Sequence, residues 1–396
     1  MANAVIVDAV RTAGGKRNGK LSGWHPADLA GEVLKALAER NNLDPALIDD
    51  VIMGCVMQVG DQGVNIGRNA VLAAGWPESV PATTIDRQCG SSQQAAHFAA
   101  QGVIAGAYDI VVAAGVEVMS TTPMGASMIP GSLPFGPRVL ERYAAVGGLV
   151  PQGISAELIA DKWGLSREDL DAFGARSQQL AEQATHEGRF QNEIIPLKAR
   201  LKDRESGSII DLDELVTADE GIRPGTTLET LGKLKPAFKP DGKVTAGNSS
   251  QITDGAAAVL IMSEEKAAAL GLRPRARFHS FALAGVDPIT MLTGPIPATH
   301  KVLERAKLTL DDMDAVEINE AFASVVLAWE KELHPNMSLV NPNGGAIALG
   351  HPLGCSGAKL MATLLNELER TGGRYGLQTM CEGGGMANAT IIERLG

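Results

Sequence analysis

At 396 residues the chain is longer than one hydrophobic core comfortably supports, so its length predicts two or three domains. Hydrophobic residues make up 45% of it, as in an ordinary globular protein, and 45 glycines with few aromatics indicate packing through small residues. The formal net charge of −11 argues against nucleic acid or an anionic membrane as a partner.

The four cysteines show no Cys-x-x-Cys pairing, so the chain carries neither a zinc signature nor a small disulfide framework. Residues 1–11 run straight into a strand pattern, and no signal peptide, transit peptide or membrane-length apolar run is present. These features predict a soluble cytoplasmic protein with reduced thiols. The cysteines are Cys55, Cys89, Cys355 and Cys381.

Strand and helix patterns alternate through the first part of the chain, which predicts a mostly parallel α/β layer. The strand at 80–85 is expected to be buried and to lead into the turn that carries Cys89. The predicted strands lie at 5–9, 49–54, 80–85 and 109–114, and the predicted helices at 26–40, 67–74 and 90–106.

The same plan returns near the end of the chain, at an offset of about 265 residues. Cys355 heads a helix as Cys89 does, and each helix leads into a strand. We therefore predict an internal duplication, with two α/β halves of one topology. The second copy comprises strands at 275–281 and 313–318 and helices at 298–306 and 355–372.

A stretch of different texture separates the two copies. Residues 121–153 predict a long surface excursion, 166–187 a polar helix opened by a capping box, and 198–213 a solvated hairpin or loop. Loops this long usually serve a function or make contacts in an oligomer. We therefore expect the insert to cover a site built by the two α/β halves.

These patterns predict three structural units. The N-terminal half is 1–119 plus 244–272, and the C-terminal half is 273–396. Residues 120–243 form a loop domain that covers the substrate site and contributes oligomer contacts.

Cys89 is the first candidate for chemistry, because it lies at a strand-to-helix turn. Unpaired backbone N–H groups and the positive end of the helix dipole favour a thiolate there, and Gly90 leaves the approach to the sulfur open. A buried structural cysteine is the plain alternative, since free cysteines are among the most buried residues.

Three later turns carry polar groups at strand or helix ends. Asn319 ends an apolar strand, His351 lies in a turn pinned by Gly and Pro, and Cys381 precedes three glycines. Each alone has a structural explanation. Together they supply what a cysteine nucleophile needs: a base, a second acid and donors for an oxyanion. Cys55, Cys355 and His97 are expected to be packing residues.

Four blocks resemble the signature blocks of the thiolase family, in order and spacing, over essentially the whole chain. The resemblance implies the thiolase fold, with two βαβαβαβ-type halves in a five-layered αβαβα core and an inserted loop domain. It also implies thiolytic cleavage of 3-ketoacyl-CoA, or the reverse Claisen condensation, in a homodimer or homotetramer. CoA would be a substrate, with no metal or redox cofactor. The blocks are Cys89-Gly90-Ser91-Ser92, Asn319-Glu320-Ala321-Phe322, Gly350-His351-Pro352 and Cys381-Glu382-Gly383-Gly384-Gly385.

The resemblance also implies roles for individual residues. Cys89 would be acylated, and His351 would take its proton and, with a water held by Asn319, stabilise the enolate. Cys381 would carry the proton to and from the acetyl carbon. Backbone N–H groups of Cys89 and Gly383 would form the oxyanion hole. The substrate- and CoA-binding residues would be Arg223, Ser250, Ala321, Phe322 and Met291.

The subgroup is indicated by Pro151-Gln152-Gly153. At this position, acetoacetyl-CoA-forming thiolases carry His-Met-Gly and degradative thiolases often carry Pro-Met-Gly. Pro151 therefore resembles the degradative type, whereas Gln152 matches neither type. The blocks around Cys89 and Cys381 most resemble thiolases of fatty-acid and sterol side-chain degradation.

Several alternatives stay open. One is an acetoacetyl-CoA-forming acetyltransferase. Another is a decarboxylating ketoacyl synthase, against which Cys381 argues. A third is a non-catalytic acyl-CoA-binding protein, which would be expected to have lost Cys89, His351 or Cys381. A dithiol oxidoreductase using Cys89 and Cys381 is the most remote.

Overall fold

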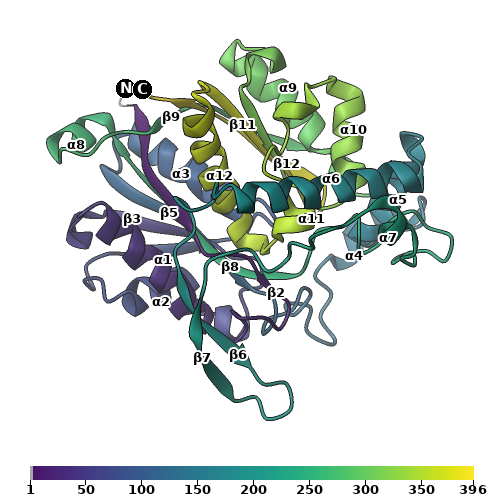
Figure 1. The fold of residues 1–396 in the computed structure, drawn as a ribbon, viewed down its shortest axis with the longest axis horizontal. Helices are drawn as coiled ribbons and strands as arrows, with labels where there is room; N and C mark the ends of the chain where they lie inside the picture. The colour runs from purple at the N-terminus through teal and green to yellow at the C-terminus, as the bar shows by residue number, and fades with distance from the viewer. Residues whose placement is uncertain (1–2) are drawn as a thin grey trace.

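The protein is built around one ten-stranded mixed sheet (Figure 1). The computed structural model describes residues 3–396, so the first two positions of the predicted N-terminal half lie outside that range. The strand order is β10-β11-β12-β9-β1-β8-β5-β3-β4, with β2 paired to β8. The strands are β1 (Ala4–Arg11), β2 (Gly15–Lys16), β3 (Asp50–Gly54), β4 (Ala82–Ile85), β5 (Ile110–Val118), β8 (Thr253–Ser263), β9 (Ala276–Gly285), β10 (Ala315–Ile318), β11 (Tyr375–Glu382) and β12 (Met386–Arg394).

The sheet consists of two half-sheets that meet at β1 and β9, where only Val5 with Arg277 and Ile6 with Ala276 are in register. The expectation of a mostly parallel layer is wrong. Pairs β3–β4, β3–β5 and β10–β11 are parallel, but the other pairs are antiparallel. The reason is local: β11 turns back into β12 through three glycines, a tight connection that only antiparallel strands can use.

Helices form three layers around the two half-sheets. Alternate residues of each strand face opposite sides, so Val112 packs toward the outer helices α1 and α2 while Val111 packs toward α3 and α12. Helices α3 and α12 share one core with strands of both halves, and α9 and α10 cover the far side. The result is the five-layered αβαβα arrangement. The helices are α1 (Pro26–Arg40), α2 (Ile66–Ala73), α3 (Ser91–Ile104), α8 (Glu264–Ala269), α9 (Pro295–Ala306), α10 (Ala323–Leu333), α11 (Ala346–Leu349) and α12 (Ser356–Thr371).

The two halves repeat one plan, as the sequence predicts. Strands β3 and β10 each pair in parallel with the strand that follows a central helix, β5 after α3 and β11 after α12. The central helices touch, since Ser92 Oγ accepts a hydrogen bond of 2.9 Å from the N–H of Ala358. Cys89 and Cys355 therefore lie near the junction of the halves.

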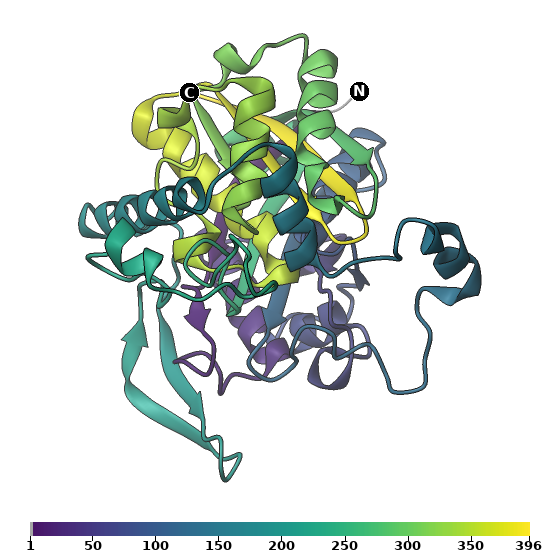
Figure 2. The same cartoon turned by 90° about the vertical axis from the view of Figure 1, so that its right-hand side faces the viewer.

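The insert contains both the predicted hairpin and a helix that the sequence pattern does not reveal. Strands β6 (Leu197–Lys202) and β7 (Ile209–Val216) pair antiparallel, and α6 (Arg167–His186) opens with the predicted capping box of Ser166 and Asp169. The predicted surface excursion carries α4 (Gly136–Ala144) on an arm that stands away from the body (Figure 2). Helices α5 (Gln152–Lys162) and α7 (Leu228–Gly232) complete the insert.

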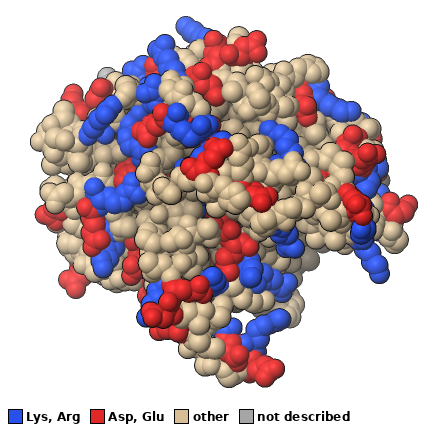
Figure 3. Space-filling view, viewed as in Figure 1, with Lys and Arg blue, Asp and Glu red and all other residues tan. Residues whose placement is uncertain are grey.

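Strand β4 differs from its prediction because it is partly exposed. It pairs with β3 alone, so it forms one end of the sheet. In residues 3–396 we find no helix long and apolar enough to cross a bilayer. On the face shown in Figure 3, acidic and basic side chains are interspersed.

Candidate active site

Cys89 lies in the turn between β4 and α3, with only 5% of its surface exposed. Gln88, just before it, adopts a positive φ of 49°, and Gly90 is the N-cap of α3. The sulfur belongs to a small apolar cluster that includes Leu353, two residues after His351. The turn of one half thus packs against the histidine turn of the other.

Gly90 is required here by the neighbouring carboxyl group of Glu382. A Cβ at position 90 would collide with the Glu382 carboxylate and lie 2.7 Å from Nδ2 of Asn388. Both carboxylate oxygens of Glu382 are buried without a hydrogen-bond partner. Burial raises the pKa of Glu382 to about 8, because Arg87 only partly offsets the loss of water.

The Cys89 thiol is protonated at neutral pH. Burial, followed by the nearby Glu382 carboxyl, raises the pKa of Cys89 to about 12. Hydrogen bonds from the N–H groups of Cys89 and Gly383 and from the Gln152 side chain oppose this rise. The backbone N–H groups at this turn do favour the thiolate, but burial outweighs them.

The backbone of the His351 turn is held from two sides. Gly350 adopts a φ of +81°, and a Cβ there would collide with Oγ1 of Thr253. The N–H of His351 donates to the same oxygen at 3.1 Å. Nζ of the buried Lys359 donates to the carbonyl oxygens of Leu349 at 2.5 Å and Gly350 at 3.1 Å.

The His351 imidazole is neutral and has a defined tautomer. Its Nδ1 lies 2.5 Å from Oγ of Ser356, whose own proton is donated to the carbonyl of Pro352 at 2.8 Å. We therefore assign the histidine proton to Nδ1, which leaves a lone pair on Nε2. Burial, with Lys359 nearby, lowers the pKa of His351 to about 3. Nε2 faces Nδ2 of Asn319 at 3.4 Å.

Asn319 and Cys381 come to the same place because β10 and β11 are parallel neighbours. The N–H of Asn319 donates to the carbonyl of Thr379 at 3.0 Å, and Cys381 lies two residues further along β11. Burial, and then the charge of Cys89, raise the pKa of the Cys381 thiol well above its ordinary value. The two thiols therefore lie close enough for the charge of one to raise the pKa of the other.

Gly383 follows β11, and its backbone N–H lowers the pKa of the Cys89 thiol, which places it beside the sulfur. The structure therefore brings Cys89, Gly383 and Cys381 together, with His351 and Asn319 as a hydrogen-bonded pair beside them. Each comes from a different turn of the two halves.

The predicted CoA-binding residues are more spread out. The N–H of Ser250 donates to the carbonyl of Ala321 at 3.0 Å, and the Phe322 ring meets Phe238 edge-on at 6.0 Å. Ala321, Phe322 and Met291 are buried. Arg223 is exposed on the insert, where its N–H donates to Oε1 of Gln178 at 2.8 Å.

Several supporting residues were not singled out from the sequence. Glu320 is buried and accepts hydrogen bonds from Ser177 at 2.6 Å, Asn341 at 2.9 Å and the N–H of Ile347 at 3.1 Å, which fixes the segment after Asn319. Ser356 orients the imidazole. Because Glu320 lies inside a signature block, the sequence could have indicated its importance. Nothing in the sequence pattern indicates a role for Ser356.

The residues set aside as structural lie outside this site. His97 stacks on Phe281 and its Nε2 lies 2.7 Å from Oγ1 of Thr390. Cys55 neighbours Glu117, and Cys355 heads α12 inside the central core. Within residues 3–396, no group of three or more His, Cys, Asp or Glu side chains is placed to hold a metal ion.

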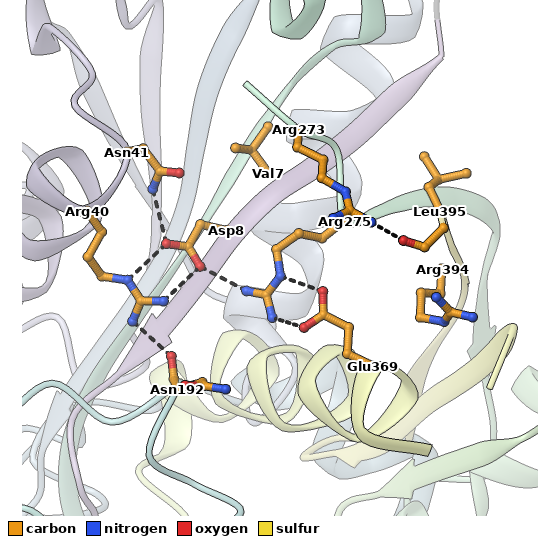
Figure 4. Close-up of a pocket in the computed structure, with 11 residues that line it drawn as sticks. Val7, Asp8, Arg40, Asn41, Asn192, Arg273, Arg275, Glu369, Arg394 and Leu395 are labelled. Carbon is orange, nitrogen blue, oxygen red and sulfur yellow. Dashed lines mark hydrogen bonds and ion pairs between the residues drawn. The ribbon is translucent and has the colours of Figure 1, made fainter. Parts of the chain in front are cut away.

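A cavity of about 630 Å³ lies near the chain termini (Figure 4). Its two acidic side chains, Asp8 and Glu369, are already held in ion pairs. Asp8 pairs with Arg40 at 3.1 Å and with Arg275 at 2.9 Å, and Glu369 pairs with Arg275 at 2.6 Å. It contains none of the residues of the candidate site.

Comparisons with known proteins agree with this geometry. The model described as Thiolase, N-terminal domain matches residues 4–265, and Thiolase, C-terminal domain matches 272–394. The steroid 3-ketoacyl-CoA thiolase FadA6 of Mycobacterium tuberculosis is 50% identical, over 100% of this chain and 95% of that protein. The 3-ketoacyl-CoA thiolase of Aliivibrio fischeri is 46% identical over 100% of both.

A solved structure gives the same result. The crystal structure of the Bacillus anthracis acetyl-CoA acetyltransferase has a TM-score of 0.88 at 40% identity, covering 100% of this chain and 99% of that chain. The duplicated halves and the site between them define a thiolase fold. The chain belongs to the thiolase family, which confirms the family and fold expected from the four signature blocks.

Proposed function

We propose that this chain is a thiolase that uses CoA to cleave 3-ketoacyl-CoA into acetyl-CoA and a shortened acyl-CoA, in a reversible reaction. The observation that carries this proposal is the meeting of two buried thiols with a backbone donor beside a neutral histidine–asparagine pair. A carbon–carbon bond breaks only if the departing carbanion is stabilised as an enolate, which requires donors and a nearby acid.

In the first half-reaction, the Cys89 thiol transfers its proton to Nε2 of His351 as the sulfur attacks the 3-keto carbon. Because the resting thiol and imidazole are both neutral, this transfer accompanies the attack. The N–H groups of Cys89 and Gly383 stabilise the oxyanion. The C2–C3 bond then breaks, which leaves the acyl group on Cys89 and an acetyl-CoA enolate.

Cys381 protonates carbon 2 of that enolate, so acetyl-CoA leaves and Cys381 becomes a thiolate. The enolate oxygen is stabilised meanwhile by His351 and by a water held by Asn319. The proton on His351 then passes to the Cys381 thiolate, which restores both groups. In the second half-reaction CoA gives its thiol proton to His351 and attacks the acyl group. The shortened acyl-CoA departs, and the proton on His351 returns to Cys89. The overall reaction is balanced and needs no metal or redox cofactor.

We place the reaction in fatty-acid β-oxidation or steroid degradation, which the names of the 50% and 46% identical relatives support. The second candidate is an acetoacetyl-CoA-forming acetyltransferase, which the 40% identity to the Bacillus anthracis enzyme favours. Pro151 at the head of α5 supports the degradative assignment.

We further propose that Arg223, Ser250, Ala321, Phe322 and Met291 line the path of CoA and acyl chain. Four free, buried cysteines favour a cytoplasmic location. A homodimer or homotetramer is favoured by the arm around α4, whose large apolar side chains are exposed. We further propose a division at 1–119 plus 244–272, 120–243 and 273–396. Separate outer cores support the two halves, and residues of the insert pack into both cores.

The proposal is tested by CoA-dependent cleavage of a panel of 3-ketoacyl-CoA esters, from acetoacetyl to long-chain and sterol-derived. Preference for longer or bulky chains would establish the degradative enzyme. Fast cleavage of acetoacetyl-CoA alone would favour the second candidate. Absence of cleavage across the panel would contradict both and leave an acyl-CoA-binding protein.

A further inference from the structure

Gln152 is the residue of the Pro-Gln-Gly segment that matches neither thiolase pattern, and the structure places it at the nucleophile. It is the first residue of α5, after the extended N-cap Pro151. It belongs to the insert, whereas Cys89 belongs to the N-terminal half. A contact between Gln152 and Cys89 therefore links the insert that covers the site to the sulfur that reacts.

The backbone around Gln152 is held firmly. Gly153 packs so closely on the Phe238 ring that a Cβ there would collide with it. Phe238 in turn meets Phe322 edge-on, with ring centroids 6.0 Å apart and planes at 76°. Helix α5 also packs against the turn Met291–Thr293. The start of α5 is thus fixed against two segments that border the site.

The side chain of Gln152 reaches the sulfur from this fixed base. Its Nε2 lies 3.3 Å from the place that a Cβ of Gly383 would occupy, and Oε1 of Gln88 lies 3.1 Å from the same point. Two amides therefore flank the glycine whose N–H faces Cys89. The Gln152 side chain also lowers the pKa of the Cys89 thiol, so its amide lies near the sulfur.

We propose that the side-chain amide of Gln152 is a third hydrogen-bond donor to the sulfur of Cys89, beside the backbone N–H groups of Cys89 and Gly383. A methionine at this position would supply no donor. Burial and Glu382 both disfavour negative charge on this sulfur, so a donor from the insert offsets part of that penalty. The thiolate is needed twice, as nucleophile and as leaving group when CoA attacks the acyl enzyme.

This inference rests on the proposed function for the role of Cys89, but its test needs no substrate. The rate of iodoacetamide alkylation at Cys89 is followed against pH by peptide mass spectrometry, which separates Cys89 from the other thiols. Below the thiol pKa, this rate follows the thiolate fraction. Gln152→Met keeps the side-chain length and removes the donor. Gln183→Met, on the exposed face of α6, is the matched control.

We expect Gln152→Met to alkylate about tenfold more slowly at each pH, equivalent to a shift of about one pH unit. Gln152→Glu, an isostere whose carboxylate has no donor, should slow alkylation at least as much. Gln183→Met should match the wild type. Coincident profiles for Gln152→Met and wild type would overturn the donor role even if the enzyme cleaves its substrates. A slowed Gln152→Met profile would uphold it even if the cleavage panel fails.

Discussion

Ser356 fixes the protonation state of His351 through a contact of 2.5 Å between its Oγ and the imidazole Nδ1. The serine proton is already donated to the Pro352 carbonyl, so the hydroxyl oxygen accepts the histidine proton. Nε2 is then a free base that faces Asn319. The tautomer of His351 that the reaction requires is therefore set by Ser356, a residue with no proposed contact with the substrate.

Ser356→Ala should lower kcat by about tenfold to a hundredfold, because the imidazole can then rotate or protonate at Nε2. The measurement is kcat and KM for 3-ketoacyl-CoA cleavage, with KM expected to change little. Ser206→Ala, in the exposed β6–β7 turn, is the control. An unchanged kcat in Ser356→Ala would contradict the orienting role.

Cys381→Ala should separate the two half-reactions. Exchange of an acyl group between acyl-CoA and Cys89 needs no carbon acid and should persist, whereas cleavage of 3-ketoacyl-CoA should fall by about 10²–10⁴-fold. Stopped-flow cleavage and label exchange between acyl-CoA and CoA measure the two activities. Wild-type cleavage by Cys381→Ala would refute its acid/base role.

Gly350→Ala should unfold more easily than Gly106→Ala. Both glycines have positive φ, but Gly350 combines a φ of 81° with a ψ of 163°, a region essentially restricted to glycine. Its substitution should therefore cost more than the roughly 1–2 kcal/mol expected at Gly106, where φ is 75°. Only at position 350 would the new Cβ also collide with Thr253, since nothing lies within 4 Å at position 106. Urea unfolding should show the larger loss for Gly350→Ala, together with lost cleavage activity. Equal midpoints would show that the contact with Thr253 does not constrain the turn.

Glu382→Gln should raise stability at high pH. The folded protein holds the Glu382 proton more tightly than the unfolded chain, so this carboxyl's stabilising contribution is present below pH 4.5 and lost as the pH rises through about 8. The variant cannot ionise, so its Tm should match wild type near pH 4.5 and exceed it by about 2 °C or more at pH 8.5. A pH-independent difference, or none, would argue against a buried ionisable carboxyl. Glu304→Gln, on the exposed face of α9, serves as control.

Local patterns allowed much of the fold to be predicted. Helix α1 has the expected limits, and the capping box of α6 was visible as Ser166 and Asp169. Helix α4 was missed because it is short and lies in a stretch rich in Gly and Pro, although its apolar side chains share one face; none of its side chains is buried. The strand directions were mistaken because helix–strand alternation does not reveal that β11 returns directly into β12.

The site was predictable only in part. The signature blocks singled out Cys89, His351, Asn319, Cys381 and Gly383 as candidates. The duplication predicted that the turns of Cys89 and His351 face each other. The contacts of Ser356 with His351 and of Gln152 with Cys89 depend on how separate segments pack, which periodicity cannot give. The neutral resting thiol likewise depends on burial, a property of the folded protein.

The central claim is that Cys89 carries the acyl group and Cys381 does not. Its most direct test is intact-mass and peptide mass spectrometry after incubation with acyl-CoA and rapid acid quench. We predict one acyl adduct per chain, on the peptide that contains Cys89, in the wild type and in Cys381→Ala, and none in Cys89→Ala. An adduct on Cys381, or acylation that persists in Cys89→Ala, would contradict the account.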